Sequence, residues 1–315
     1  MQGFSYEIRS ALSEAVARCR TETISLSGGL DSSILASFLE RGTIAYSMVA
    51  KDFASADLVN AQLVAKIFDL NLRILSVPIP VLLEAVEHTI IILRIFNPIE
   101  IRNNIVVYLT MKRAKEDGFR SMMTGDGADE LFAGYRFFQR MSDTELKKDL
   151  ERIWQVMHFP SRSIAKSLGV ELHTPFLDPK VVDIAKSIPP ELKVREKEGK
   201  KYGKWILRLT FEGSLPGTVV WRDKVAMQDG SGTVGLVGFF DNMVADATFS
   251  DKAKNFLEKD HVRLHSKESL YYYEIYRKYY DPPSDSGLSK NKCPNCNYSV
   301  NQDSHFCRMC GSYPI

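Results

Sequence analysis

The sequence has no long uncharged hydrophobic stretch, no signal-like amino terminus and no excess of one charge. Its longest apolar run, residues 81–95, carries four titratable side chains, so it is too short and too polar to span a bilayer. Residues 1–7 lack the basic-then-apolar pattern of a secretory signal. The 41 Lys and Arg residues nearly balance the 39 Asp and Glu residues, for a net charge of +2, which provides no global attraction to nucleic acid or membranes. These absences predict a soluble cytoplasmic protein.

Cysteine is almost absent before the carboxyl terminus. Only Cys19 precedes residue 293, and the other four of the five cysteines follow it late in the chain. A disulfide framework is therefore not expected, whereas the clustering favours a bound metal. The composition is otherwise ordinary for a globular protein, with 44% hydrophobic and 25% charged residues. A chain of 315 residues is long enough for a large core and for two domains plus an appendage.

Short apolar runs alternate with segments of helical spacing in the first 125 residues. The runs predict strands at 23–26, 44–49, 72–77 and 121–124, and the intervening segments predict helices at 56–68, 81–93 and 101–115. Strands separated by helices indicate a parallel twisted sheet covered by helices on both faces. Beyond residue 135 helical spacing dominates, up to a last helix that begins at Ser266 or Ser269. The predicted fold class is α/β with a helical second half.

The loop that follows the first predicted strand is suited to an anion. Residues 25–33 read Ser-Leu-Ser-Gly-Gly-Leu-Asp-Ser-Ser. The Gly-Gly turn lets the backbone approach a ligand, and the first turn of the next helix offers unpaired N–H groups. The loop lacks the Lys and the spacing of a kinase-type P-loop. We interpret it as a nucleotide phosphate site, with a strand–turn–helix corner as the alternative, and the predicted ligands are Leu26, Ser27, Gly28, Gly29, Asp31, Ser32 and Ser33.

A second suggestive loop follows the fourth predicted strand. Residues 124–135 read Thr-Gly-Asp-Gly-Ala-Asp-Glu-Leu-Phe-Ala-Gly-Tyr, and Gly125 is predicted to line the nucleotide site. Ligands of a parallel sheet bind past the carboxyl ends of its strands, so Asp31 and Asp129 are expected to face each other there. Together they would hold Mg²⁺ between triphosphate oxygens. The alternative is an acidic first turn that the helix dipole favours.

Four segments, at 25–33, 124–135, 169–178 and 215–224, resemble in order the motifs of the asparagine synthetase branch of the PP-loop ATP pyrophosphatase family. Asp126 stands where that family has Glu, and His173 stands where it has Arg. The resemblance covers roughly residues 5–283. It implies an adenine nucleotide α-hydrolase-like fold. It also implies a ligase that uses ATP and Mg²⁺ to adenylate a carboxylate, releases pyrophosphate and forms an amide with ammonia or another amine.

The resemblance also implies roles for individual residues. Lys224 would stabilise the negative charge of the transition state, and Asp126 would contact the adenylated or amine-accepting group. Arg102, in a segment that stands where the family has Ile-Arg-x-Ser-x-Pro but lacks the Ser and the Pro, would pair with a substrate carboxylate. Asp129 would contact substrate as well as metal.

Three further segments leave alternatives open. If the first two predicted strands are neighbours, the backbone of Val49 would bind the edge of adenine; a plain strand end is an equal alternative. The basic run 193–204 is interpreted as a solvated face, with contact of Lys200 or Lys204 to phosphate as the minority alternative. The glycine-rich segment 229–238 suits either a lid that excludes water or a disordered surface loop.

The carboxyl terminus predicts a separate metal-binding segment. The predicted domains are 1–280, a linker at 281–291 with Pro, Ser and Gly, and a zinc ribbon at 292–315. Two Cys-x2-Cys pairs ten residues apart would hold structural Zn²⁺ through four thiolates, namely those of Cys293, Cys296, Cys307 and Cys310. Docking of the ribbon to protein, to RNA or to the parent domain stays open.

Two other functions compete with the ligase. A tRNA-modifying PP-loop enzyme would combine a similar loop with zinc knuckles, and a non-catalytic ATP-binding protein would use the ribbon for docking. We expect no glutaminase domain ahead of the phosphate loop, and therefore ammonia from solution or from a separate partner. ATP and a small-molecule carboxylate are the expected ligands, without a membrane.

Overall fold

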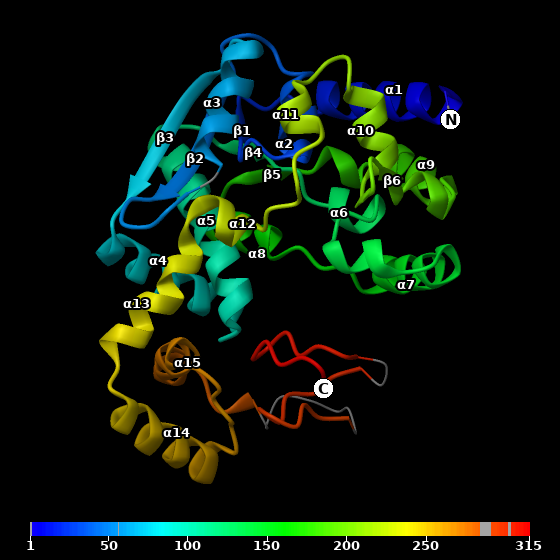
Figure 1. Cartoon of the computed structure of the whole chain (residues 1–315). Coiled ribbons are helices and arrows are strands. Elements are labelled where there is room, and N and C mark those ends of the chain that lie inside the picture. Colours follow the sequence, from blue (N-terminus) through cyan, green and yellow to red (C-terminus); the bar gives the residue numbers. More distant parts are fainter. Residues whose placement is uncertain (1, 56, 284–290, 302–303) are drawn as a thin grey trace. The chain divides into compact units, whose positions relative to one another are not determined.

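The computed structural model describes residues 2–55, 57–283, 291–301 and 304–315 (Figure 1). Contacts divide the chain into two compact units. The first comprises Met1–Met48, Ala56–Leu75 and Thr110–Ala226, and the second comprises Val49–Ser55, Ser76–Leu109 and Met227–Ile315. The division into residues 1–280, 281–291 and 292–315 stays a prediction. Most of its linker, residues 284–290, lies outside the described residues.

The first unit is built on a five-stranded sheet, which confirms the predicted α/β fold. The strand order is β3 (Asn71–Val77), β2 (Ile44–Ala50), β1 (Thr23–Ser25), β4 (Ser121–Met123) and β5 (Glu171–His173). β1 pairs in parallel with β2 and β4, and β4 pairs in parallel with β5. Buried apolar side chains fill the strands at the centre, with Ile24 and Met123 fully buried. Strand β5 was not predicted, because it lies beyond residue 135, where helical spacing dominates the sequence.

The helices of the first unit pack around this sheet. α1 (Gln2–Cys19) lies against α9 (Pro179–Ser187) and α10 (Trp205–Phe211), and one core cluster joins their apolar faces with the sheet. The remaining α-helices are α2 (Leu30–Ala36), α3 (Leu58–Ile67), α6 (Ala128–Leu131), α7 (Asp143–Val156), α8 (Pro160–Leu168) and α11 (Gly217–Val220). Short 3-10 turns at Arg136–Arg140, Pro175–Leu177 and Pro190–Leu192, and a hairpin of β6 (Arg195–Lys197) and β7 (Lys200–Tyr202), complete the unit.

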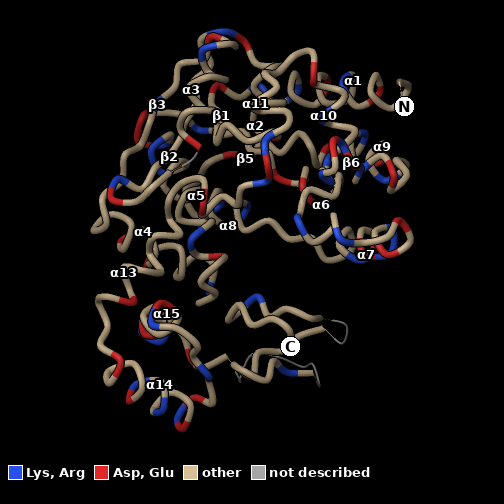
Figure 2. The backbone as a smooth tube through the Cα atoms, viewed as in Figure 1, with Lys and Arg blue, Asp and Glu red and all other residues tan. Residues whose placement is uncertain are grey.

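The second unit is helical. It contains α4 (Ile79–Leu93), α5 (Pro98–Glu116) up to Leu109, α12 (Met227–Ser231), a 3-10 turn at Thr233–Gly235, α13 (Leu236–Met243), α14 (Asp246–Asp260) and α15 (Lys267–Tyr279). α15 packs against α4 and α13. Acidic and basic residues are interspersed along α7 of the first unit and α14 of the second (Figure 2). Within the described residues, none of the helices has the length and apolar character needed to cross a bilayer.

Two local expectations in the second unit have clear outcomes. Ser266 caps α15, because its Oγ accepts the Ser269 N–H at 3.0 Å and Ser269 Oγ accepts the Ser266 N–H at 3.0 Å. The glycine-rich segment 229–238 is not a disordered loop. Ser231 and Thr233 are buried within it, and a Cβ at Gly235 would lie only 2.3 Å from the Phe53 ring. Its glycines permit close packing.

Candidate active site

The loop after β1 is shaped by glycine and closed by serine. Gly28 adopts φ +73°, and a Cβ there would lie 2.3 Å from the backbone nitrogen of Ala61, so no larger residue fits without displacing α3. Ser27 Oγ accepts the Gly29 N–H at 3.2 Å and lies 3.2 Å from Ser32 Oγ. These contacts fix the chain as it enters α2.

The loop after β4 approaches the first loop closely. A Cβ on Gly125 would lie 3.0 Å from the Asp31 Cβ. Gly127, at φ +96°, begins α6, which carries Asp129. Gly134 is the tightest position: a Cβ there would lie 1.9 Å from Asp129 Oδ1 and 2.2 Å from Lys204 Cε. The glycines of this motif therefore leave room for charged side chains.

Four charged side chains meet where these loops converge. Lys204 Nζ lies 2.5 Å from Asp31 Oδ2 and 2.5 Å from Asp129 Oδ1. Lys224 Nζ lies 2.5 Å from Asp129 Oδ2. Asp31 and Asp129 thus come together, as the sequence led us to expect, but through an ammonium group of the chain itself.

Within this cluster, Asp129 and Lys224 stabilise each other's charged form. Burial opposes the charge on Asp129, but Lys204 and Lys224 outweigh it and hold the pKa of the Asp129 carboxyl below its usual range. Burial likewise lowers the pKa of Lys224, and the charges of Asp129 and Asp31 more than compensate, so that the net pKa is raised. The two shifts favour the charged forms of Asp129 and Lys224, which lie 2.5 Å apart.

The cluster retains capacity for a ligand. Among the described residues, Asp31 Oδ1 and Ser33 Oγ are buried and have no hydrogen-bond partner. Buried polar atoms are normally paired, so both atoms are suited to a cation or to a polar group of a nucleotide. This donor set fits Mg²⁺, which favours carboxylate and phosphate oxygens.

Lys204 is the residue for which the preferred sequence interpretation was wrong. The basic run 193–204 was interpreted as a solvated face, yet the Lys204 side chain is only 3% exposed. Lys193 is also buried, and its Nζ donates to the Leu131 carbonyl at 2.9 Å. Lys200 does behave as expected: it is half exposed and pairs with Asp223. The sequence of this basic run does not distinguish the buried lysines from the exposed one, because their burial depends on packing against distant segments.

Asp126 is anchored beside the cluster. Its Oδ2 accepts hydrogen bonds from Thr124 Oγ1 at 3.1 Å and from Ser161 Oγ at 2.5 Å. Burial raises the pKa of the Asp126 carboxyl despite these two donors. His173 ends β5, the neighbour of the strand that leads to Asp126, and burial lowers the pKa of its imidazole. His173 is therefore a neutral side chain where the resembling family carries a permanent cation.

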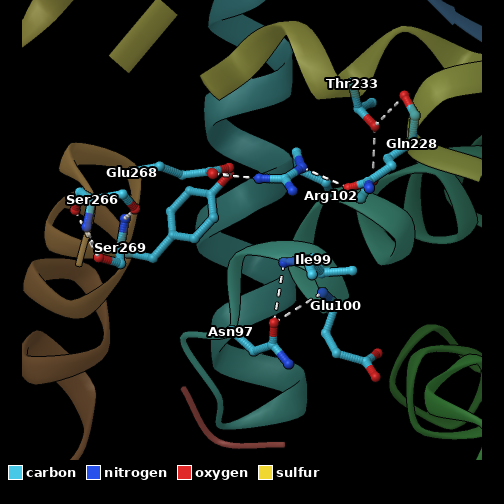
Figure 3. A network of polar contacts seen from close by, with 10 residues as sticks. Asn97, Ile99, Glu100, Arg102, Gln228, Thr233, Ser266, Glu268 and Ser269 are labelled. Carbon is cyan, nitrogen blue, oxygen red and sulfur yellow. Dashed lines mark hydrogen bonds and ion pairs between the residues drawn. The ribbon is translucent and has the colours of Figure 1, made fainter. Parts of the chain in front are cut away.

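Arg102 belongs to a buried network of the second unit (Figure 3). Its Nη1 pairs with Glu268 of α15, and its Nε donates to Gln228 Oε1 at 2.7 Å. Tyr272 donates its hydroxyl to the other Glu268 oxygen at 2.9 Å. Most of the hydrogen-bonding capacity of Arg102 is thus used to join α5, α12 and α15.

Val49 is the penultimate residue of β2 and its side chain is buried. β2 is the neighbour of β1, which is the condition on which the adenine role of Val49 depends. That role itself stays a prediction.

The four carboxyl-terminal cysteines converge. Their sulfur atoms all lie within 4.8 Å of one another, and the pairs Cys293–Cys310 and Cys296–Cys307 are both 3.7 Å apart. A disulfide would need about 2.05 Å. Tetrahedral Zn²⁺ with Zn–S bonds of about 2.3 Å places its sulfurs about 3.8 Å apart. The geometry of the four thiols therefore fits zinc.

Comparisons with known proteins agree with the motifs. The family pattern described as asparagine synthase matches residues 7–166 and 143–291. An asparagine synthetase [glutamine-hydrolyzing] of Sandersonia aurantiaca is 27% identical over 91% of this chain and 59% of its own length. Asparagine synthetase [glutamine-hydrolyzing] 3 of Arabidopsis thaliana is 28% identical over 81% of this chain and 48% of its own length. This chain thus spans about half of the curated relatives that it matches.

A solved NMN synthetase from Francisella tularensis is a distant structural match. It covers 88% of this chain and 92% of its own, with a TM-score of 0.39 and 14% sequence identity. The extent of the family match, over most of the described residues of both units, carries the assignment. The chain belongs to the asparagine synthase family.

Proposed function

We propose that the chain activates a carboxylic acid with ATP and converts it to an amide, with AMP and pyrophosphate as the other products. The observation that carries the proposal is the cluster of Asp31, Asp129, Lys204 and Lys224, in which two carboxylates hold two ammonium groups at 2.5 Å. Membership of the asparagine synthase family supports the same class of reaction.

The first step would be adenylation. A carboxylate oxygen of the acid attacks the α-phosphorus of ATP, and the bond from this phosphorus to the oxygen that bridges to the β-phosphate breaks. Negative charge grows on the phosphoryl oxygens and on the departing pyrophosphate. The ammonium groups of Lys204 and Lys224 are the cations of this chain suited to stabilise it, and one such preorganised donor contributes about 10²–10³-fold to the rate.

Asp31 and Asp129 are the residues that would hold Mg²⁺, and Asp31 Oδ1 is free for it. Bound Mg²⁺ would neutralise triphosphate charge. Lys204 lies between the same two carboxylates. It therefore contributes a fixed positive charge that does not depend on metal concentration.

The second step would be amide formation. An amine attacks the acyl carbon, loses a proton and displaces AMP. We assign Asp126 to the contact with the reacting acyl or amine group, because its carboxylate is fixed by Thr124 and Ser161. Contact of the Val49 backbone with adenine, which follows from the neighbouring of β1 and β2, and contact of Arg102 with a substrate carboxylate stay predictions from the sequence.

The test is product analysis with a panel of carboxylic acids. Purified chain is incubated with ATP, Mg²⁺ and each acid, with and without ammonium, and AMP, ADP, pyrophosphate and phosphate are quantified. With an acid labelled with ¹⁸O in its carboxyl group, adenylation followed by amide formation transfers one ¹⁸O to AMP. Formation of ADP and phosphate, or no acid-dependent product with any member of the panel, would refute the proposal.

A further inference from the structure

The second Cys-x2-Cys pair lies against the loop that leads into α5. The Phe96 N–H donates to the Met309 carbonyl at 3.0 Å, and Asn97 Nδ2 donates to the Arg308 carbonyl at 3.3 Å. A Cβ on Gly311 would lie 2.6 Å from Asn97 Oδ1. Since both Met309 and Phe96 are buried, this contact belongs to the core of the second unit.

Asn97 also begins α5. Its Oδ1 accepts the N–H groups of Ile99 at 3.1 Å and Glu100 at 3.4 Å (Figure 3). These are two of the N–H groups that the first turn of a helix leaves without a partner in the helix. One side chain therefore connects the cysteine segment with the amino end of α5.

The first Cys-x2-Cys pair contacts the loop that leads into α15. The Arg263 N–H donates to the Asn295 carbonyl at 2.7 Å, and His265 Nε2 lies 3.1 Å from Asn295 Oδ1. Asn297 Nδ2 donates to the His261 carbonyl at 3.4 Å. Each pair of cysteines thus contacts a different interhelical loop, and the four thiols join the two pairs.

The same two helices meet again one turn further on. Arg102 lies in the second turn of α5, Glu268 lies in the first turn of α15, and their side chains form an ion pair that is nearly inaccessible to solvent. A buried ion pair compensates for its desolvation only when its geometry is well fixed. The Phe96 ring extends the contact, at 4.7 Å from Tyr273 and 5.4 Å from Tyr276 of α15.

We propose that the four cysteines form an internal zinc clamp, which holds the amino ends of α5 and α15 in register and thereby maintains the Arg102–Glu268 ion pair. The surfaces of the two cysteine pairs described above thus bind the chain's own loops before α5 and α15, not a separate protein or RNA. A segment this small has too little core to fold alone, so metal binding supplies its folding free energy and transmits it to both loops through the contacts above. This inference does not depend on the reaction catalysed.

Hydrogen exchange of the full chain, with and without zinc, tests the clamp. Zinc content is first measured on protein purified without chelator, and one zinc per chain is expected. Zinc is then removed with a chelator or by the double substitution C296S/C307S, and Cys19→Ser serves as the matched control. We expect amides of residues 97–103 and 266–272 to exchange about tenfold faster or more, equivalent to about 1.4 kcal/mol of local stability. Amides of α1 should be unaffected.

A second variant keeps all four thiols. Gly311→Ala, at φ +83°, places a methyl group against Asn97, whereas Gly42→Ala, at φ +81° and with nothing within 4 Å, is its control. Gly311→Ala should retain zinc and still accelerate exchange at the start of α5, a result that remains informative if zinc removal unfolds the whole chain. The clamp is refuted if no zinc is bound, or if zinc removal and Gly311→Ala change exchange only within residues 292–315.

Discussion

The two units each contain a buried group of charges, and the two groups are built differently. In the second unit, the side chains of Arg102 and Glu268 are 8% and 4% exposed, and neighbouring Gln228 and Tyr272 take up further hydrogen-bonding capacity. In the first unit, Asp31 and Asp129 remain 19% and 18% exposed around Lys204. Asp31 Oδ1 there lacks a partner among the described residues.

From this difference we infer a structural role for Arg102 and Glu268 and a ligand-binding role for the group around Asp31 and Asp129. Charges that satisfy one another completely hold helices together, while charges with unused capacity are available to a ligand. We call the cluster of Asp31, Asp129, Lys204 and Lys224 the open group. Arg102 and Lys224 were both predicted as site residues, and of these two Lys224 belongs to the open group. Substitutions in the two groups should therefore affect different properties.

The largest effect on stability is expected at Arg102. Arg102→Leu leaves the Glu268 carboxylate buried without its cation, which costs about 3–5 kcal/mol. The double variant R102L/E268L removes both charges and should recover most of this loss. Urea denaturation of the single and double variants measures both values.

Glu268→Leu alone completes the double-mutant cycle, and Arg152→Leu, at a partly exposed surface pair with Asp149, is a control expected to cost less than about 1 kcal/mol. The contrast between the two groups of charges would fail if Arg102→Leu lost less than about 1 kcal/mol of stability and also bound the acid more weakly. Arg102 would then be primarily a substrate residue.

The second largest effect is a loss of activity at Lys224. Lys224→Met removes one of the two ammonium groups from Asp129 and should lower kcat by about 10²–10³-fold, as for the loss of a preorganised donor to transition-state charge. Its effect on the free energy of unfolding should be smaller than that of Arg102→Leu, because Lys204 still neutralises Asp129.

Pyrophosphate release under saturating ATP provides the rate, and Lys200→Met, at a half-exposed lysine that pairs with Asp223, provides the control. Unchanged turnover of Lys224→Met with any active acid would show that the open group is not the catalytic one.

The order of elements in the first 125 residues was predictable because it is encoded locally. Short apolar runs mark β1 to β4, helical spacing marks the helices between them, and glycine marks loops such as that of Gly28, where φ is positive. The loop motifs led us to expect that Asp31 and Asp129 would meet, because the ends of neighbouring parallel strands lie at one edge of a sheet.

What could not be predicted depends on contacts between distant segments. Lys204 lies 173 positions from Asp31, and nothing in the run 193–204 distinguishes it from exposed Lys200. The pairing of Arg102 with Glu268 spans 166 positions. Side-chain partners of this kind follow from packing, which a local pattern does not record.

The smallest effect in the first unit concerns Lys193, a buried cation with no acidic partner among its recorded contacts. Its Nζ donates to Leu131 at the end of α6 and lies 4.6 Å from the centroid of the Trp154 ring, while burial lowers its pKa to about 7. An unfolded chain keeps this lysine protonated up to about pH 10.4. The unfolded state therefore binds more protons above pH 7, and stability should rise with pH by up to about 1.4 kcal/mol per unit until about pH 10.

Urea midpoints of the wild-type chain and Lys193→Met at pH 7.5 and 9.5 isolate this contribution, because other titrating groups are common to both proteins. The stability gain between the two pH values should be smaller in Lys193→Met than in the wild type by about 2–3 kcal/mol, allowing for two pH units at that slope. Below pH 7 both states of Lys193 are protonated, so the two proteins should respond to pH in parallel. If the stabilities of the two proteins also change in parallel above pH 7, Lys193 stays charged in the folded protein. The carboxyl end of α6, the helix of Asp129, would then contact a permanent cation.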